Sequence, residues 1–195
     1  IPTEEIKRFN EYIDFKTLEK WFYELLHEYA KWASWELKWH EKRNISIKNI
    51  EFPFEYRPGQ NTLVKGVYQT ILRKTRKRPV SFIFAGPTGV GKTISTIFPA
   101  VKAMGEELSE KLFYLTAKTI TRTVAQDAFN ILLDNGVHLK YVTITAKEKI
   151  CILDKPTCNP GSCPRALGHF DRVNDAVFDV ITHEEHITRE IVSTY

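Results

Sequence analysis

The eight residues at 86–93, GPTGVGKT, limit the possible folds of this chain more than any other stretch. They fit the pattern G-x-x-x-x-G-K-[ST] in full, with an apolar run at 80–85 before them and a helical pattern at 93–104 after them. A glycine-rich turn between a strand and a helix lets successive backbone N–H groups point at phosphate oxygens, and the N-terminal end of the helix dipole attracts the same anion. The sequence therefore predicts a strand–loop–helix unit that binds a nucleotide. A glycine-rich turn without a ligand is the alternative.

Each residue type in this loop has an expected role. Lys92 is expected to reach the β- and γ-phosphates of ATP, and the Thr93 hydroxyl to coordinate Mg²⁺, which makes these two the expected catalytic residues. The other loop residues are expected to wrap the phosphates with their backbone: Gly86, Pro87, Thr88, Gly89, Val90 and Gly91. ATP and Mg²⁺ are therefore the expected ligands.

Apolar runs alternate with helical patterns around the loop. The expected strands are 80–85, 111–117 and 139–145, and the expected helices between them are 93–104 and 121–136, the second ended by Asn135-Gly136. Strands at this spacing are typical of a parallel sheet covered by helices. The predicted fold class is therefore α/β, with a parallel sheet flanked by helices.

A helical segment is predicted before this unit. Residues 14–43 read as one long amphipathic helix with Trp21, Leu25, Trp32, Trp35 and Trp39 near helical spacing. Burial of this aromatic face on the next domain is the interpretation favoured here, and a base-stacking surface is the alternative. Pro53 and Pro58 predict an extended connector at 44–60, and a further helix follows it.

Charge and composition exclude few function classes. The formal net charge is +4, which fits an anionic partner without demanding one. A basic run at 73–78 is interpreted as a solvated helix end, with a nucleic-acid contact as the alternative. No apolar stretch approaches the length of a membrane span, so we expect a cytoplasmic protein with no membrane contact. The chain begins at Ile1 and its one methionine is Met104, which suggests a piece of a longer protein.

Four segments together resemble a known family, the iron–sulfur superfamily 2 DNA helicases of the XPD/DinG-like group. The resemblance covers about residues 50–195, and its segments are YRPGQ at 56–60, AGPTGVGKT at 85–93, 114–128 and 149–179. It implies the N-terminal part of a helicase core. The implied parts are a helical connector at 1–50, a partial RecA-like ATP-binding domain at 51–146, and an incomplete, helical iron–sulfur domain at 147–195.

The resemblance also implies roles for individual residues. Arg57 and Gln60 match the segment that reads the adenine base, and a glutamine amide can both donate to and accept from an adenine edge. Thr116, Lys118, Thr119 and Arg122 match the motif that touches the DNA backbone, which makes single-stranded DNA the expected partner. Helix capping by Thr119 or Thr121 would explain part of that cluster without any DNA.

The three cysteines lie within thirteen residues. Cys151, Cys158 and Cys163 match three of the four thiolates that hold a 4Fe–4S cluster in the family, and the fourth ligand is not in this chain. His169 offers an alternative, a Cys₃His zinc site. Three free thiols are the third interpretation.

Two features of the family are missing from the sequence. Glu184 and Glu185 follow an apolar run, but that run continues a helical pattern, so they do not form the acidic DEAH-type box. The second motor domain is also missing. We therefore expect the parent protein to be an ATP-hydrolysing DNA helicase and this chain to bind nucleotide at most. A P-loop ATPase or kinase of another family, and a zinc-bound DNA-binding module with a vestigial phosphate loop, are the alternatives.

Overall fold

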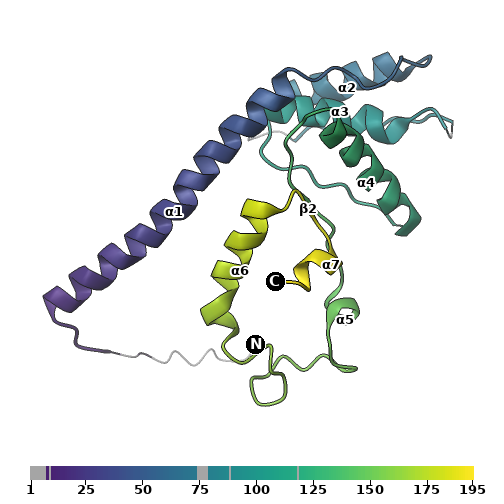
Figure 1. Ribbon diagram of the computed structural model, residues 1–195. Helices are drawn as coiled ribbons and strands as arrows, with labels where there is room; N and C mark the ends of the chain where they lie inside the picture. The colour runs from purple at the N-terminus through teal and green to yellow at the C-terminus, as the bar shows by residue number, and fades with distance from the viewer. Residues whose placement is uncertain (1–7, 9, 74–78, 88, 118) are drawn as a thin grey trace. The chain divides into compact units, whose positions relative to one another are not determined.

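The computed structural model describes residues 8, 10–73, 79–87, 89–117 and 119–195, with the side chains of 119–121 also outside the description. These residues form seven α-helices and a two-stranded sheet (Figure 1). The chain divides into two units, 1–39 and 40–195, and each is described by itself. None of the described helices has both the length and the apolar character needed to cross a membrane.

The first unit is mostly one helix. Helix α1 (Phe15–Lys48) begins in this unit and continues into the second. Asp14 caps it, because its carboxylate accepts hydrogen bonds from the backbone N–H groups of Lys16 and Thr17 at 3.1 and 3.2 Å. Within this unit Trp21 and Leu25 are more than half exposed, at 56% and 51%.

The second unit has its core between four helical segments. Helices α2 (Gln60–Leu72), α3 (Lys92–Gly105) and α4 (Thr119–Asp134) pack in series, and the last turn of α1 joins them. Ile47 lies against Gly105, where an added Cβ would approach the Ile47 Cβ to 2.8 Å. Lys102 on α3 donates hydrogen bonds to the carbonyl groups of Ile47, Lys48 and Ile50 at 2.9–3.2 Å, which neutralises the C-terminal end of α1.

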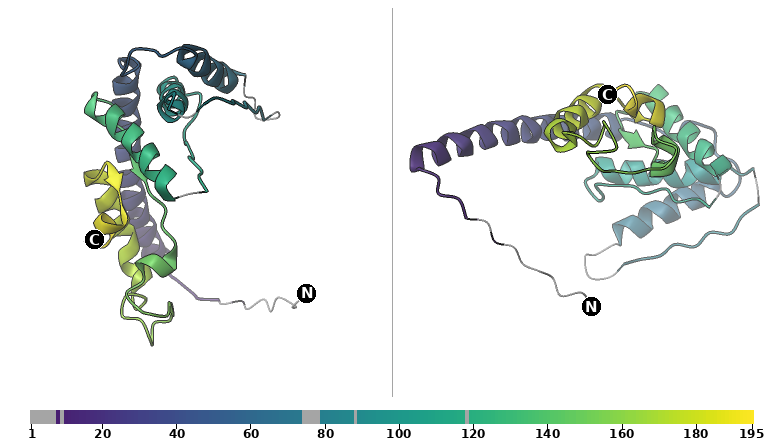
Figure 2. Two further views of the ribbon diagram at one scale, coloured as in Figure 1. Left: turned by 90° about the vertical axis from the view of Figure 1, so that its right-hand side faces the viewer. Right: turned by 90° about the horizontal axis from the view of Figure 1, so that it is seen from below.

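The rest of this unit holds one further long helix, α6, and four short elements. Strand β1 (Tyr141–Val142) is followed by α5 (Lys147–Ile150), α6 (His169–His183), strand β2 (His186–Ile187) and α7 (Arg189–Val192). The two strands are parallel, with Tyr141 opposite His186 and Val142 opposite Ile187. Figure 2 shows α5, α6 and α7 together in both of its views.

The predicted RecA-like parallel sheet is wrong for this structure. Of the described residues, only 141–142 and 186–187 pair as strands, and 80–85 and 111–117 run extended without a strand beside them. A parallel strand forms only where neighbouring strands satisfy its backbone N–H and C=O groups. Phe82 of segment 80–85 instead contacts α2, with its ring over Gly66. The third expected strand is reduced to β1, whose partner comes from the C-terminal segment.

Candidate nucleotide-binding site

The phosphate loop has the local geometry that its sequence predicts. Gly89 and Gly91 have φ angles of +81° and +74°, in the left-handed region where a side chain is strained. These two residues turn the chain so that α3 begins at Lys92. Thr88 lies outside the described residues. The predicted helix after the loop is present with 14 residues, whereas the predicted strand before it is not formed.

Lys92 folds back over the loop. Its ammonium group donates hydrogen bonds to the carbonyl oxygens of Gly86 and Pro87, at 2.9 and 2.6 Å. Thr93 follows on the first turn of α3 and is half-buried. The loop therefore carries the ammonium group of a flexible lysine side chain at the N-terminus of a helix. This arrangement suits a phosphate group.

Arg57 and Gln60 hold the same loop from the other side. The Arg57 guanidinium donates to the carbonyl of Gly89 at 2.7 Å, and the Gln60 side-chain amide donates to the carbonyl of Val90 at 2.8 Å. The Gln60 side-chain oxygen accepts from the Arg57 backbone N–H at 2.8 Å, and the Gln60 residue is buried. Both side chains thus contact loop backbone, and the prediction that they read adenine stays a prediction.

This bracing of the loop can be tested without any nucleotide. We expect Gln60→Ala to speed amide hydrogen exchange in residues 86–91 by about three- to tenfold, because the loop loses a side-chain bond worth about 0.5–1.5 kcal/mol and Val90 loses its partner. Gln69→Ala, at an exposed position of the same helix, is the matched control and should leave the exchange unchanged. Equal exchange in the Gln60 variant and the wild type would show that the bond does not hold the loop.

The expected DNA-contacting residues lie at the start of α4. Helix α4 begins at Thr119, and Thr116 is exposed in the extended segment before it. Arg122 is half-buried, and within the described part of the chain its Nε atom is buried without a hydrogen-bond partner. Lys118 and the Thr119 side chain lie outside the described residues. The structure does not bring this segment and the phosphate loop into one site through any described contact.

The three cysteines differ in their surroundings. Cys151 is half-buried, Cys158 is exposed and Cys163 is buried. A hydrogen bond with the Cys158 side chain raises the pKa of Lys147. Among the residues that the structure describes, no three His, Cys, Asp or Glu side chains lie close enough to hold a metal ion, His169 included. The predicted 4Fe–4S and zinc sites therefore stay predictions.

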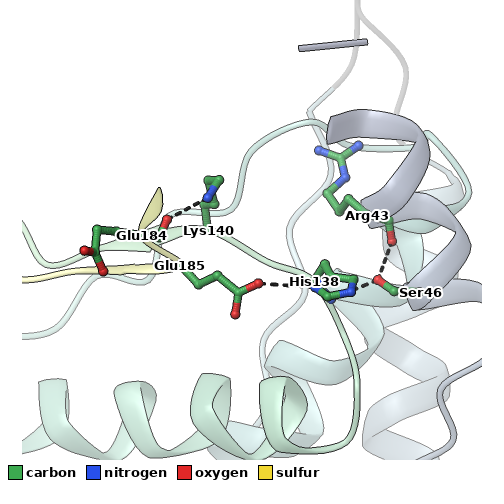
Figure 3. Close-up of polar contacts among 6 residues, drawn as sticks. All are labelled: Arg43, Ser46, His138, Lys140, Glu184 and Glu185. Atoms are coloured by element: carbon green, nitrogen blue, oxygen red, sulfur yellow. Dashed lines mark hydrogen bonds and ion pairs between the residues drawn. The ribbon is translucent and has the colours of Figure 1, made fainter. Parts of the chain in front are cut away.

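A set of polar contacts beyond the sequence prediction joins α1, β1 and the end of α6 (Figure 3). The Nδ1 atom of His138 lies 3.2 Å from the Glu185 carboxylate, and the His138 backbone N–H donates to the Ser46 hydroxyl at 2.9 Å. Lys140 donates to the Glu184 carbonyl at 2.6 Å, and burial lowers the pKa of Lys140.

These contacts are structural and not a catalytic triad. The Ser46 hydroxyl meets the backbone of His138, not its ring, and itself donates to the Arg43 carbonyl at 2.7 Å. A nucleophile needs its hydroxyl against the imidazole. Glu185 contacts His138, and the apolar run before Glu184 lies on α6, as its helical pattern predicts. Contacts across 47 and 92 residues carry no local sequence signal.

Comparison with known proteins adds no relative: no family model, no curated protein and no solved structure matches this chain.

Proposed function

We propose that this chain binds ATP with Mg²⁺ through the loop at residues 86–93. The observation that supports this most is the position of Lys92, whose ammonium lies over the loop carbonyls of Gly86 and Pro87 at the start of α3. In a loop of this sequence the lysine binds the β- and γ-phosphates of the nucleotide. The bracing by Arg57 and Gln60 supports the same proposal, because a preformed loop loses less entropy when it binds.

The residues of the loop would act by binding and orienting the phosphate chain. Lys92 would exchange two neutral carbonyl acceptors for negatively charged phosphate oxygens, so that both partners of each hydrogen bond carry a charge. Gly89 and Gly91 allow the backbone to approach the phosphates closely. Thr93, on the first helical turn, would hold Mg²⁺ through its hydroxyl.

We further propose that this chain is part of an ATP-dependent DNA helicase that moves along single-stranded DNA. This part rests on the family resemblance of the sequence. Arg122 matches the backbone-contacting motif of that family, and its guanidinium group has the chemistry to bond to a backbone phosphate. Nucleotide binding and DNA binding would then be two properties of the segment that runs from the loop to α4.

Single-stranded DNA binding tests this proposal. We expect a labelled oligothymidylate to bind with an affinity that falls as salt rises, and Arg122→Ala to reduce the slope of log K against log salt by about 0.7, the loss of one phosphate contact. Arg165→Ala removes the same charge at an exposed position and is the control. An equal slope for wild type and Arg122→Ala in fluorescence anisotropy would contradict the proposed contact.

A 4Fe–4S cluster on Cys151, Cys158 and Cys163 stays a proposal from the resemblance alone. The three thiols do not come together among the described residues, so no step of the proposed activity is derived through a cluster.

A further inference from the structure

A groove of about 700 Å³ lies between residues 111–117 and 139–144 of the second unit. Helix α4 lines it with Arg122, Ala125, Gln126 and Phe129. These four positions have the i, i+3, i+4, i+7 spacing of one helix face, so they form a stripe along the groove. None of the described residues of the phosphate loop lines this α4 groove, as we name it, which makes it a separate site.

The two ends of the α4 groove differ in polarity. At one end the Phe129 ring stacks on the Tyr141 ring, with the ring centroids 5.1 Å apart. At the other end the Gln126 side-chain amide donates to the Thr143 hydroxyl at 2.8 Å. Arg122 lies one helical turn beyond Gln126 and about 10 Å along the helix axis from Phe129. Phe129 packs against buried core residues that also line the groove, namely Val101, Met104 and Leu139.

Arg122 gives the polar end its positive charge. Its side chain is half-buried, whereas Glu190, an acid whose charge acts on it, is exposed and lies outside the lining. Water and salt screen the charge of an exposed acid. Among the described residues of the lining, the other charges are compensated. Glu110 and Lys111 are neighbours of opposite sign, and the ammonium group of Lys140 donates to a backbone carbonyl at 2.6 Å.

We propose that the α4 groove binds a small amphipathic carboxylate, with its carboxylate on Arg122 and its apolar body toward Phe129. A guanidinium group can hold both oxygens of a carboxylate through two parallel hydrogen bonds. The length of about 10 Å between the two ends suits an extended aliphatic chain of medium length. Contact of that chain with the apolar end removes its surface from water, which favours binding.

The single charge of Arg122 favours a carboxylate over a phosphate ester. A phosphate monoester carries a charge of about −1.5 to −2 at pH 7, which one guanidinium group does not neutralise. A neutral apolar molecule would leave the half-buried charge of Arg122 without a counter-ion, and the same charge would repel a cation.

A matched series of probes tests this proposal on the full chain without nucleotide or DNA. Octanoate, octanol and octylammonium share one apolar chain and differ in the charge of the head group. We expect octanoate to bind about tenfold more tightly than octanol, and octylammonium to bind more weakly than octanol. Octanoate should shift the amide NMR signals of residues 122–129 and 139–144 and leave those of the phosphate loop unchanged. Octanol that binds as tightly as octanoate, or failure of all three probes to bind, would overturn the proposal.

Variants of Arg122 give a second readout. Arg122→Gln should lower the affinity for octanoate to that for octanol and leave the affinity for octanol unchanged, which also shows that the groove stays folded. Arg122→Lys keeps the charge and should retain part of the preference for octanoate. Arg165→Gln removes a charge at an exposed position, and this control should bind all three probes like the wild type. A preference for octanoate that survives in Arg122→Gln would contradict the proposed contact. Since no nucleotide or DNA is present, the result is independent of the proposed helicase function.

Discussion

Replacement of Lys92 by alanine is expected to lower the affinity for Mg²⁺-ATP by about 10- to 100-fold. The ammonium group is the cation that the structure places over the loop, within 2.9 Å of the Gly86 and Pro87 carbonyls. A hydrogen bond between charged partners contributes about 1.5–3 kcal/mol, which converts to that range of affinity. The loop backbone and the helix N-terminus stay in the variant, so weak binding should remain.

Isothermal titration calorimetry measures this effect. Lys65→Ala removes the same charge at an exposed position of α2 and should bind Mg²⁺-ATP like the wild type. Circular dichroism of both variants should match the wild type, because neither side chain contributes to the apolar core. Wild-type affinity in Lys92→Ala would remove the phosphate loop from the account of nucleotide binding.

Replacement of Leu132 by alanine is expected to cost about 2–5 kcal/mol of unfolding free energy. Leu132 on α4 is fully buried in the core that also holds Ile97 and Val101 of α3. The variant loses the transfer free energy of the removed atoms. It also leaves a cavity, because the packed helices around it relax only in part.

Urea unfolding followed by circular dichroism measures this cost. Leu37→Ala makes the same chemical change at a position that is 72% exposed on α1, and should shift the unfolding free energy by no more than about 0.5 kcal/mol. If Leu132→Ala is too unstable to show a folded baseline, the milder variant Val101→Ala tests the same core by the same measurement. A cost below about 1 kcal/mol for Leu132→Ala would mean that α3 and α4 do not share this core.

The sequence predicts features that depend on neighbours along the chain. The long helix expected at 14–43 is confirmed by α1. The helix continues to Lys48, so the connector predicted at 44–60 begins later than expected. The stop at Asn135-Gly136 is confirmed, because Gly136 has a φ of +86° and α4 ends at Asp134. The loop turns at Gly89 and Gly91 follow from residue types alone.

Features that depend on distant pairing escape the sequence. An apolar run at 80–85 predicts a strand, but a strand also needs a partner, and the run itself does not name one. Strand β1 pairs with residues 45 positions later, at His186 and Ile187. The contacts of Arg57 and Gln60 with the loop span about 30 residues, so the sequence does not reveal them. The chemistry of the two side chains alone suits contact with adenine as well as contact with the loop.

The cysteines show that residues close in sequence need not lie close together in space. Cys151, Cys158 and Cys163 are close in sequence, and that closeness predicted a shared metal. Their exposure differs from one thiol to the next, with Cys158 exposed and Cys163 buried in the same irregular segment between α5 and α6. Closeness in sequence therefore did not bring the three sulfur atoms together among the described residues.

The central claim is that the loop at 86–93 holds a phosphate chain, and a nucleotide series tests it most directly. Calorimetric titration of the wild type with ATP, ADP, AMP and adenosine, each with Mg²⁺, separates binding of the phosphates from binding of the base. The account predicts that ATP and ADP bind, that AMP binds at least about tenfold more weakly, and that adenosine shows no binding. Adenosine that binds as tightly as ATP, or a chain that binds none of the four, would contradict it.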